Sequence, residues 1–214
     1  MKKFISTVRN IFSIEDLRVR IVNTIGFLII FRLGSFIVLP GVDPSKLGAA
    51  PEGIFGLIDT FLGGAFSNAS IFGLGIMPYI SASIVLQLLT VGVPYFQKMQ
   101  KDGESGRKRI NQITRVLTIA ITVAQGIGYV SATILPTGAV MISTSLFMFS
   151  SLVLLSAGTM FCMWLGEKIT EKGIGNGISL LIAVGILSRL PGAFIAEVGK
   201  SFEGGNLIKL VLEV

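Results

Sequence analysis

Charged residues are scarce in this 214-residue chain, and histidine is absent altogether. Aspartate, glutamate, lysine and arginine make up 14% of the residues, whereas hydrophobic residues make up 51% and the mean hydropathy is +0.79. This balance is typical of an integral membrane protein. The lack of histidine removes the commonest general base and metal ligand. The single cysteine, Cys162, excludes a disulfide framework, and its apolar surroundings favour an inert core residue.

The charges that are present do not form a catalytic or nucleic-acid-binding pattern. The net charge of +6 comes from basic residues in the short loops between apolar segments. The acidic residues lie near the ends of those segments, without a glycine-rich phosphate loop beside them. GLGIMP at 73–78 is not a dinucleotide fingerprint, because no strand–helix unit surrounds it. We therefore expect no enzymatic activity, no metal site and no cofactor.

The longest uncharged stretch runs from Phe61 to Pro94. It exceeds the ~20 residues that one membrane span takes, and glycines, Asn68 and Pro78 interrupt its first half. Its second half, residues 76–93, is apolar enough to cross a membrane alone. The pattern predicts a short, loosely tethered helix that enters the membrane from one side and is hinged to a full span. Irregular backbone at membrane depth must be buried in protein or line an aqueous cavity, which indicates a channel or transporter.

Apolar segments divide the chain into five predicted spans. Residues 1–20 place apolar side chains at helical spacing among lysines and arginines, as in an amphipathic helix on a membrane surface. Residues 206–214 are too short to cross and are expected to begin a sixth span that is cut short. The five predicted spans, within a unit of residues 21–205, are 21–39, 76–93, 113–135, 140–165 and 174–190.

Lysine and arginine alternate between the predicted loops. They are concentrated before the first span, in the loop at 98–109 and in the short charged loop at 167–172, and they are rare in the loops between. The positive-inside rule then places the N-terminus in the cytoplasm and lets the broken helix enter from outside. Arg32 lies within the first span, where a packing or snorkelling role is favoured over a substrate role.

Four segments resemble the bacterial SecY family of protein-translocation channels. They are spread over nearly the whole chain: FRLGSFIVLPGVD (31–43), FSNASIFGLGIMPYISASIVLQLLT (66–90), GESGRKRINQITR (103–115) and GTMFCMWLGEKITEKGIGNGIS (158–179). The resemblance implies an all-α, multi-pass protein of the bacterial cytoplasmic (inner) membrane. Its five spans would form one of two inverted halves of a ten-span channel, which passes unfolded secretory chains across the membrane and membrane segments into it.

The same resemblance implies several partners. The missing C-terminal half of the channel would complete the pore, with SecE and usually SecG beside it. The SecA motor or a ribosome would drive nascent chains that bear signal peptides, and membrane lipid would surround the spans.

The resemblance also assigns four sets of residues. A pore ring would contain Ile80, Ile84, Ile182 and Ile186. Ser81, Ser83, Gln87 and Thr90 would lie at a lateral gate, and Lys98, Lys101, Arg107, Lys108 and Arg109 would form a cytoplasmic partner loop. A plug helix would contain Thr60, Phe61, Leu62, Gly63, Gly64, Ala65, Phe66, Ser67, Asn68, Ala69, Ser70, Ile71 and Phe72.

Depth supports the ring independently of the resemblance. At the helical rise, Ile84 and Ile182 lie about 14 and 12 Å from the cytoplasmic surface, and Ile80 and Ile186 lie about 20 and 18 Å from it. A spacing of four residues places both members of each pair on one face of their helix. The four isoleucines would thus occupy two layers near mid-membrane, although isoleucine is also common where helices simply meet lipid.

Four alternatives remain open from the residues alone. A secondary transporter also uses broken helices and inverted repeats, although such a site usually needs polar groups at mid-membrane. A purely structural subunit would have no need of a glycine-broken segment. The lateral-gate residues are equally well explained as hydrogen bonders in helix packing, and the basic loop as a determinant of topology.

Overall fold

The computed structural model describes residues 13–47 and 53–203, and the regular elements in these ranges are helical. Short helical turns, η1 (Pro44–Lys46), η2 (Val130–Ile134) and η3 (Leu135–Thr137), accompany the longer helices. The described α-helices are α2 (Glu15–Gly34), α3 (Ile54–Phe61), α4 (Met77–Gly92), α5 (Pro94–Lys101), α6 (Gly103–Tyr129), α7 (Thr144–Lys172) and α8 (Gly177–Glu203). The all-α fold expected from the sequence is thus confirmed.

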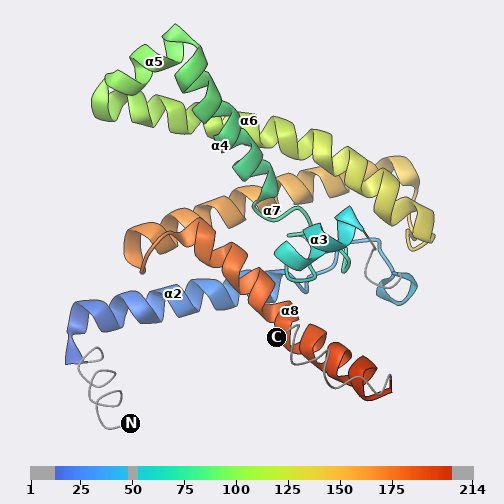
Figure 1. Ribbon diagram of the computed structural model, residues 1–214. Coiled ribbons are helices and arrows are strands. Elements are labelled where there is room, and N and C mark those ends of the chain that lie inside the picture. Colours follow the sequence, from blue (N-terminus) through green and yellow to red (C-terminus); the bar gives the residue numbers. More distant parts are fainter. Residues whose placement is uncertain (1–12, 48–52, 204–214) are drawn as a thin grey trace.

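Helix α7 occupies the middle of the arrangement and contacts α2, α6 and α8, while α4 crosses α6 (Figure 1). Small and hydroxyl side chains let these helices approach closely. Thr114, Thr118 and Thr122 are buried along one face of α6, and each hydroxyl donates to the carbonyl four residues earlier. Cys162 is fully buried in α7, as expected of a small core residue.

Several described helices have the length and apolar composition of membrane spans. Residues 103–137, 144–172 and 177–195 each meet both requirements, and α4 with α5 would form a fourth span that is bent by 98°. Helix α4 alone has 16 residues, about 24 Å at the helical rise. Helix α2 has 20 residues but carries charges at both ends. The predicted third, fourth and fifth spans therefore overlap helices that are long enough to cross a membrane. The total of five membrane spans stays a prediction.

The first predicted span, 21–39, differs from the structure at both ends. Helix α2 begins at Glu15, and the predicted surface helix at 1–20 otherwise lies outside the described residues. The helix ends at Gly34 because residues 35–39 turn away to pair with another part of the chain. The Leu39 N–H donates to the Ala69 carbonyl (2.8 Å), and the Ile71 N–H donates to the Ile37 carbonyl (2.9 Å).

The C-terminal elements are longer than predicted. The prediction of a charged loop at 167–172 is wrong, because these residues form the end of α7. Lys168 and Glu171 form an ion pair there at 2.6 Å. Asn176 caps α8 as expected, since its Oδ1 accepts the Ser179 N–H (3.2 Å). Helix α8 then continues past residue 190 and through Pro191. The predicted start of a sixth span at 206–214 lies outside the described residues.

The predicted basic loop is a helical hairpin. Helix α5 and the first turns of α6 replace it, and they project away from the other described helices (Figure 1). Gly103 makes the turn with a φ of +68°, as glycine does without steric cost. Gly106 lies inside α6 instead, where a Cβ would be 1.7 Å from the Met99 carbonyl oxygen. The two helices of the hairpin therefore touch at Gly106.

We expect Gly106→Ala to loosen this hairpin, because the methyl group has no room against the Met99 carbonyl. Overpacking of this kind typically costs about 1–3 kcal/mol. Limited trypsin digestion should then cut faster at the exposed basic residues of the hairpin. Gly128→Ala is the matched control, since it lies in the same helix with nothing within 4 Å of its Cβ position. Equal digestion rates for the two variants would contradict the close contact.

Candidate functional site

Residues 62–76, here called the re-entrant segment, connect α3 to α4 without forming a helix. The predicted plug helix at 60–72 is therefore wrong in its boundaries, because the helix lies earlier, in α3, and turns follow it. Gly63, Gly64 and Gly75 have positive φ angles, and so does Ala69 at +47°. These left-handed positions interrupt any helix. Most side chains of the segment are buried nonetheless.

The segment is held firmly by three helices, which corrects the expectation of loose tethering. The buried Tyr129 hydroxyl of α6 donates to the Phe66 carbonyl at 2.6 Å. The Phe72 ring stacks between Phe31 of α2 and Phe161 of α7, with centroids 5.9 and 5.8 Å away. At Gly158 of α7, a Cβ would lie 2.1 Å from the Ile71 carbonyl oxygen. Apolar packing and backbone hydrogen bonds thus fix an irregular stretch of chain.

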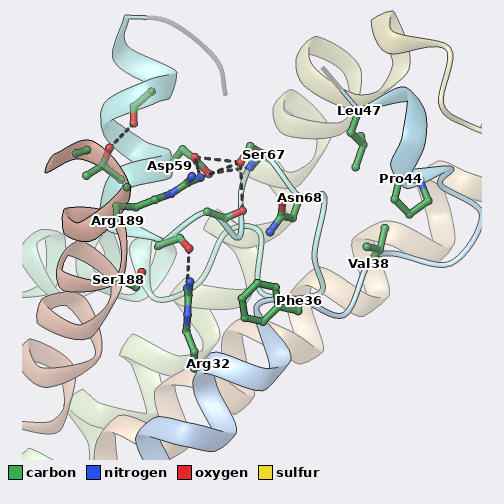
Figure 2. Close-up of a pocket in the computed structure, with 16 residues that line it drawn as sticks. Arg32, Phe36, Val38, Pro44, Leu47, Asp59, Ser67, Asn68, Ser188 and Arg189 are labelled. Atoms are coloured by element: carbon green, nitrogen blue, oxygen red, sulfur yellow. Dashed lines mark hydrogen bonds and ion pairs between the residues drawn. The ribbon is translucent and has the colours of Figure 1, made fainter. Parts of the chain in front are cut away.

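A cluster of three polar side chains fastens the start of the segment to α8 (Figure 2). Asp59, in the last turn of α3, forms an ion pair with Arg189 of α8. Its Oδ1 accepts the Ser67 N–H at 2.8 Å, and its Oδ2 accepts the Ser67 hydroxyl at 3.0 Å. The Ser67 oxygen also lies 3.2 Å from an Arg189 nitrogen. The Asp59 side chain is only 3% exposed, so the carboxylate depends on these partners.

A second arginine reaches the segment from α2. The Arg32 Nη1 donates to the Gly63 carbonyl at 2.6 Å, and the guanidinium lies 4.8 Å from the centre of the Phe36 ring. The packing role favoured for Arg32 is thereby confirmed. A Cβ on Gly63 would lie 2.8 Å from Arg32, and one on Gly64 would lie 2.7 Å from Arg189. Each glycine of the pair therefore makes room for one arginine.

A cavity of about 920 Å³ opens beside these side chains (Figure 2). It lies between α2, α3 and α8, and residues 63–68 of the re-entrant segment form part of its wall. Arg32 and Arg189 line it together with the Asp59 carboxylate. The cavity thus combines apolar walls with two arginines and one carboxylate next to the segment, and no group of metal-ligating side chains occurs among the described residues.

The structure brings two of the four predicted ring isoleucines together. Ile80 of α4 and Ile182 of α8 line one apolar pocket of about 210 Å³, and Phe61 and Leu62 line it as well. Ile84 is 52% exposed. Ile186 is half-buried and does not line this pocket. The ring as a whole therefore stays a prediction, but the start of the re-entrant segment lies against two of its members.

The predicted lateral-gate residues bond within their own helix. The Ser81 hydroxyl donates to the Met77 carbonyl (3.2 Å), and the Thr90 hydroxyl donates to the Gln87 carbonyl (2.7 Å). The Gln87 amide donates to the Ser83 hydroxyl at 3.3 Å. Ser83, Gln87 and Thr90 also line a small pocket against α6. Because these bonds lie within α4, they favour neither packing between helices nor a gate, and the gate assignment remains a proposal.

The partner-loop residues all lie on the surface of the α5–α6 hairpin. Each of the five is exposed, and none forms an ion pair among the described residues. The side chains are Lys98 and Lys101 on α5 and Arg107, Lys108 and Arg109 on α6. The structure therefore presents them to solvent beside the exposed Asp102 and Glu104, and cations predominate on the hairpin.

Sequence reasoning missed the residues that hold the segment. From the sequence, Asp59 is predicted only to lie near the end of an apolar segment, and no role is predicted for Arg189. A signal was present, because a charge inside an apolar run normally pairs with another charge. Tyr129 had no such signal, since its partner is a backbone carbonyl 63 residues away. Nothing in the sequence alone shows which distant carbonyl lacks a donor.

The fold and the site together define a class of protein. Span-length helices surround a broken segment that is buried in protein, and this arrangement belongs to membrane proteins that enclose a path or a cavity. A model of the SecY family matches residues 70–214, more than half of the chain. The chain therefore belongs to the SecY family.

Curated relatives support this assignment. The chain is 48% identical over 209 residues to protein translocase subunit SecY of Escherichia coli (strain K12), covering 94% of this chain and 46% of that protein. It is 47% identical over 211 residues to protein translocase subunit SecY of Buchnera aphidicola subsp. Acyrthosiphon kondoi, covering 94% and 59%. The chain spans about half the length of the curated relatives it matches.

Solved structures share the fold. One is Sec61 in the canine ribosome–channel complex from the endoplasmic reticulum, with a TM-score of 0.62 and 21% identity over 88% of this chain and 42% of that one. Another is a SecY protein whose plug domain stabilises the closed state of the translocation channel and maintains a membrane seal. It has a TM-score of 0.58 and 21% identity, over 88% and 41% of the two chains. Nothing in these comparisons supports a secondary transporter.

We expect Gly63→Ala to disturb the re-entrant segment much more than Gly138→Ala. Both glycines have a positive φ, +62° and +64°, so both variants carry a similar backbone cost of about 1–2 kcal/mol. Only Gly63 is crowded, by Arg32 and Ser188, whereas nothing lies within 4 Å of a Cβ at Gly138. Thermal unfolding of the purified protein should show a larger decrease in melting temperature for Gly63→Ala than for the control variant. Similar decreases for the two variants would mean that the arginine contact contributes little to stability.

Proposed function

We propose that this chain forms the N-terminal half of the pore subunit of a protein-conducting channel in the bacterial cytoplasmic membrane. The channel passes unfolded secretory chains across the membrane and lets membrane segments leave sideways. Membership of the SecY family supports this proposal, and so does the channel fold. The missing C-terminal half supplies the remainder of the ring and of the lateral gate, and the N-terminus lies in the cytoplasm.

One observation carries the proposal. Phe61 and Leu62, at the junction of α3 and the re-entrant segment, line the same apolar pocket as Ile80 and Ile182. A short segment that rests on ring residues is placed to block a pore at rest. Ile84 and Ile186 complete this half of the ring. An apolar ring holds back ions by dewetting yet offers a passing peptide no polar contact.

The ring is tested in the full-length channel with a translocating chain that is arrested midway and carries one cysteine at its centre. Single cysteines at positions 80, 84, 182 and 186 should all form disulfides with that chain, because these side chains line the path. Cysteines at Val85 and Ala183, the adjacent positions on each helix, should react far less. Uniform crosslinking at all positions, or none at the four, would disprove the ring.

The hairpin is the proposed contact for the cytoplasmic partner, the SecA motor or a ribosome, while SecE, SecG and lipid contact other faces. Its five exposed cations suit an anionic surface, and such a contact weakens as salt releases counterions. Replacing Lys101, Arg107, Lys108 and Arg109 by glutamine in the full-length channel should lower partner affinity at least tenfold at low salt and flatten its salt dependence. If partner affinity and its salt dependence are both unchanged while the membrane topology is intact, these residues serve only to determine topology.

A further inference from the structure

The pair between Asp59 and Arg189 differs from the other ion pairs in the described part of the chain. Arg20 with Asp16 and Lys168 with Glu171 each lie within one helix, and Arg115 with Glu167 is exposed on both sides. The Asp59 carboxylate is 3% exposed, and its arginine is 39% exposed. Only this pair joins α3 to α8 with a buried charge. Exposed pairs contribute little to stability, whereas breaking a buried pair leaves a charge without compensation.

The Asp59 carboxylate joins three parts of the chain. It belongs to α3, it accepts two hydrogen bonds from Ser67 in the re-entrant segment, and it binds Arg189 on α8. The last turn of a helix disfavours a negative charge, because the helix dipole is negative at that end. The position of Asp59 is therefore explained by its partners rather than by α3.

The cluster lies on the ring side of α8. Arg189 follows Ile182 by seven residues, which is two helical turns on the same face and about 10 Å along the axis. On the other element, Asp59 lies two residues before Phe61, which lines the pocket of Ile80 and Ile182 together with Leu62. The polar cluster and the apolar pocket thus fasten the same piece of chain to the same face of α8. Gly185 lies between them, where a Cβ would be 2.3 Å from the Phe61 carbonyl oxygen.

Displacement of α3 and the segment from α8 breaks the contacts with Arg189. Arg189 faces the 920 Å³ cavity and is able to regain water there, but the buried Asp59 loses its cation and keeps only its Ser67 donors. A conformational equilibrium shifts by the free energy that separates its two states. An ion pair that forms only while the segment lies against α8 therefore favours that arrangement.

We propose that Asp59, Ser67 and Arg189 form an electrostatic latch that holds the re-entrant segment against α8 in the closed channel. The inference rests on the proposed function, because it assumes that the seated segment blocks the pore. The latch adds to that function a specific pair of charges that sets how often the channel opens at rest. Arg189 and Asp59 act as positioning residues, since neither lies in the proposed ring.

The test measures resting ion conductance of the full-length channel in planar bilayers. Asp59→Asn keeps the shape and an acceptor oxygen for the Ser67 N–H but removes the charge, and it should raise the resting open probability about tenfold or more, equivalent to 1.4 kcal/mol per factor of ten. Arg189→Gln should act alike, whereas Arg189→Lys should stay near wild type because it keeps the cation. The matched control is the exposed pair on α7, where Lys168→Gln and Glu171→Gln should leave the conductance unchanged.

Deletion of residues 61–71 provides the reference for an unseated segment. If the deletion raises resting conductance while Asp59→Asn and Arg189→Gln do not, the latch is disproved and the plug stands. Equal conductance of Arg189→Gln and Arg189→Lys would also disprove it, because the charge would then be irrelevant. If the deletion has no effect and the ring cysteines capture no arrested chain, the proposed function itself fails. If Asp59→Asn does not fold, the comparison of Arg189→Gln with Arg189→Lys still tests the latch, because the Arg189 side chain is partly exposed.

Discussion

Irregular backbone among apolar helices must find its hydrogen-bond partners within the protein, and the re-entrant segment depends on this constraint throughout. The segment interrupts what would otherwise be a continuous span, and each interruption leaves carbonyl and amide groups without helical partners. The structure supplies partners from outside the segment. Tyr129 binds the Phe66 carbonyl, Arg32 binds the Gly63 carbonyl, and residues 37 and 39 exchange backbone bonds with Ile71 and Ala69. The positions of α2 and α6 follow from these bonds as much as from apolar packing.

Glycines allow these partners to approach. Gly63 and Gly64 combine left-handed backbone with the absence of a side chain where two guanidinium groups lie. Gly158 and Gly185 let the backbone of the segment touch α7 and α8 directly. A segment of larger residues would stand farther from the helices, and its carbonyls would lose the donors that satisfy them. The glycine content of this region therefore reflects close packing rather than looseness.

This distinction explains what the sequence could and could not predict. Hydropathy and the charge pattern located the apolar helices, and the uncharged, glycine-broken stretch located the re-entrant region, because these signals are local. The predicted helix at 60–72 is wrong because left-handed positions such as Gly63 and Gly64 interrupt it, and the arginines that crowd these glycines are distant in the sequence. The predicted basic loop is wrong because it forms a helical hairpin, in which Gly106 serves a helix–helix contact. The Asp59–Arg189 pair spans 130 residues, and no local pattern specifies such a contact.

The anchors of the segment also bear on how a channel built from two halves opens. Tyr129, Arg32, Asp59 and Arg189 all belong to this half, so the half by itself fixes the segment at the pocket of Ile80 and Ile182. Movement of the other half away from α4 and α8 would widen the path without breaking any of these bonds. In the proposed channel, the segment would leave only when its own polar contacts break, a step separate from the parting of the halves. Widening and unblocking would then be two events with different chemistry, one governed by apolar contact between helices and the other by hydrogen bonds and one buried ion pair.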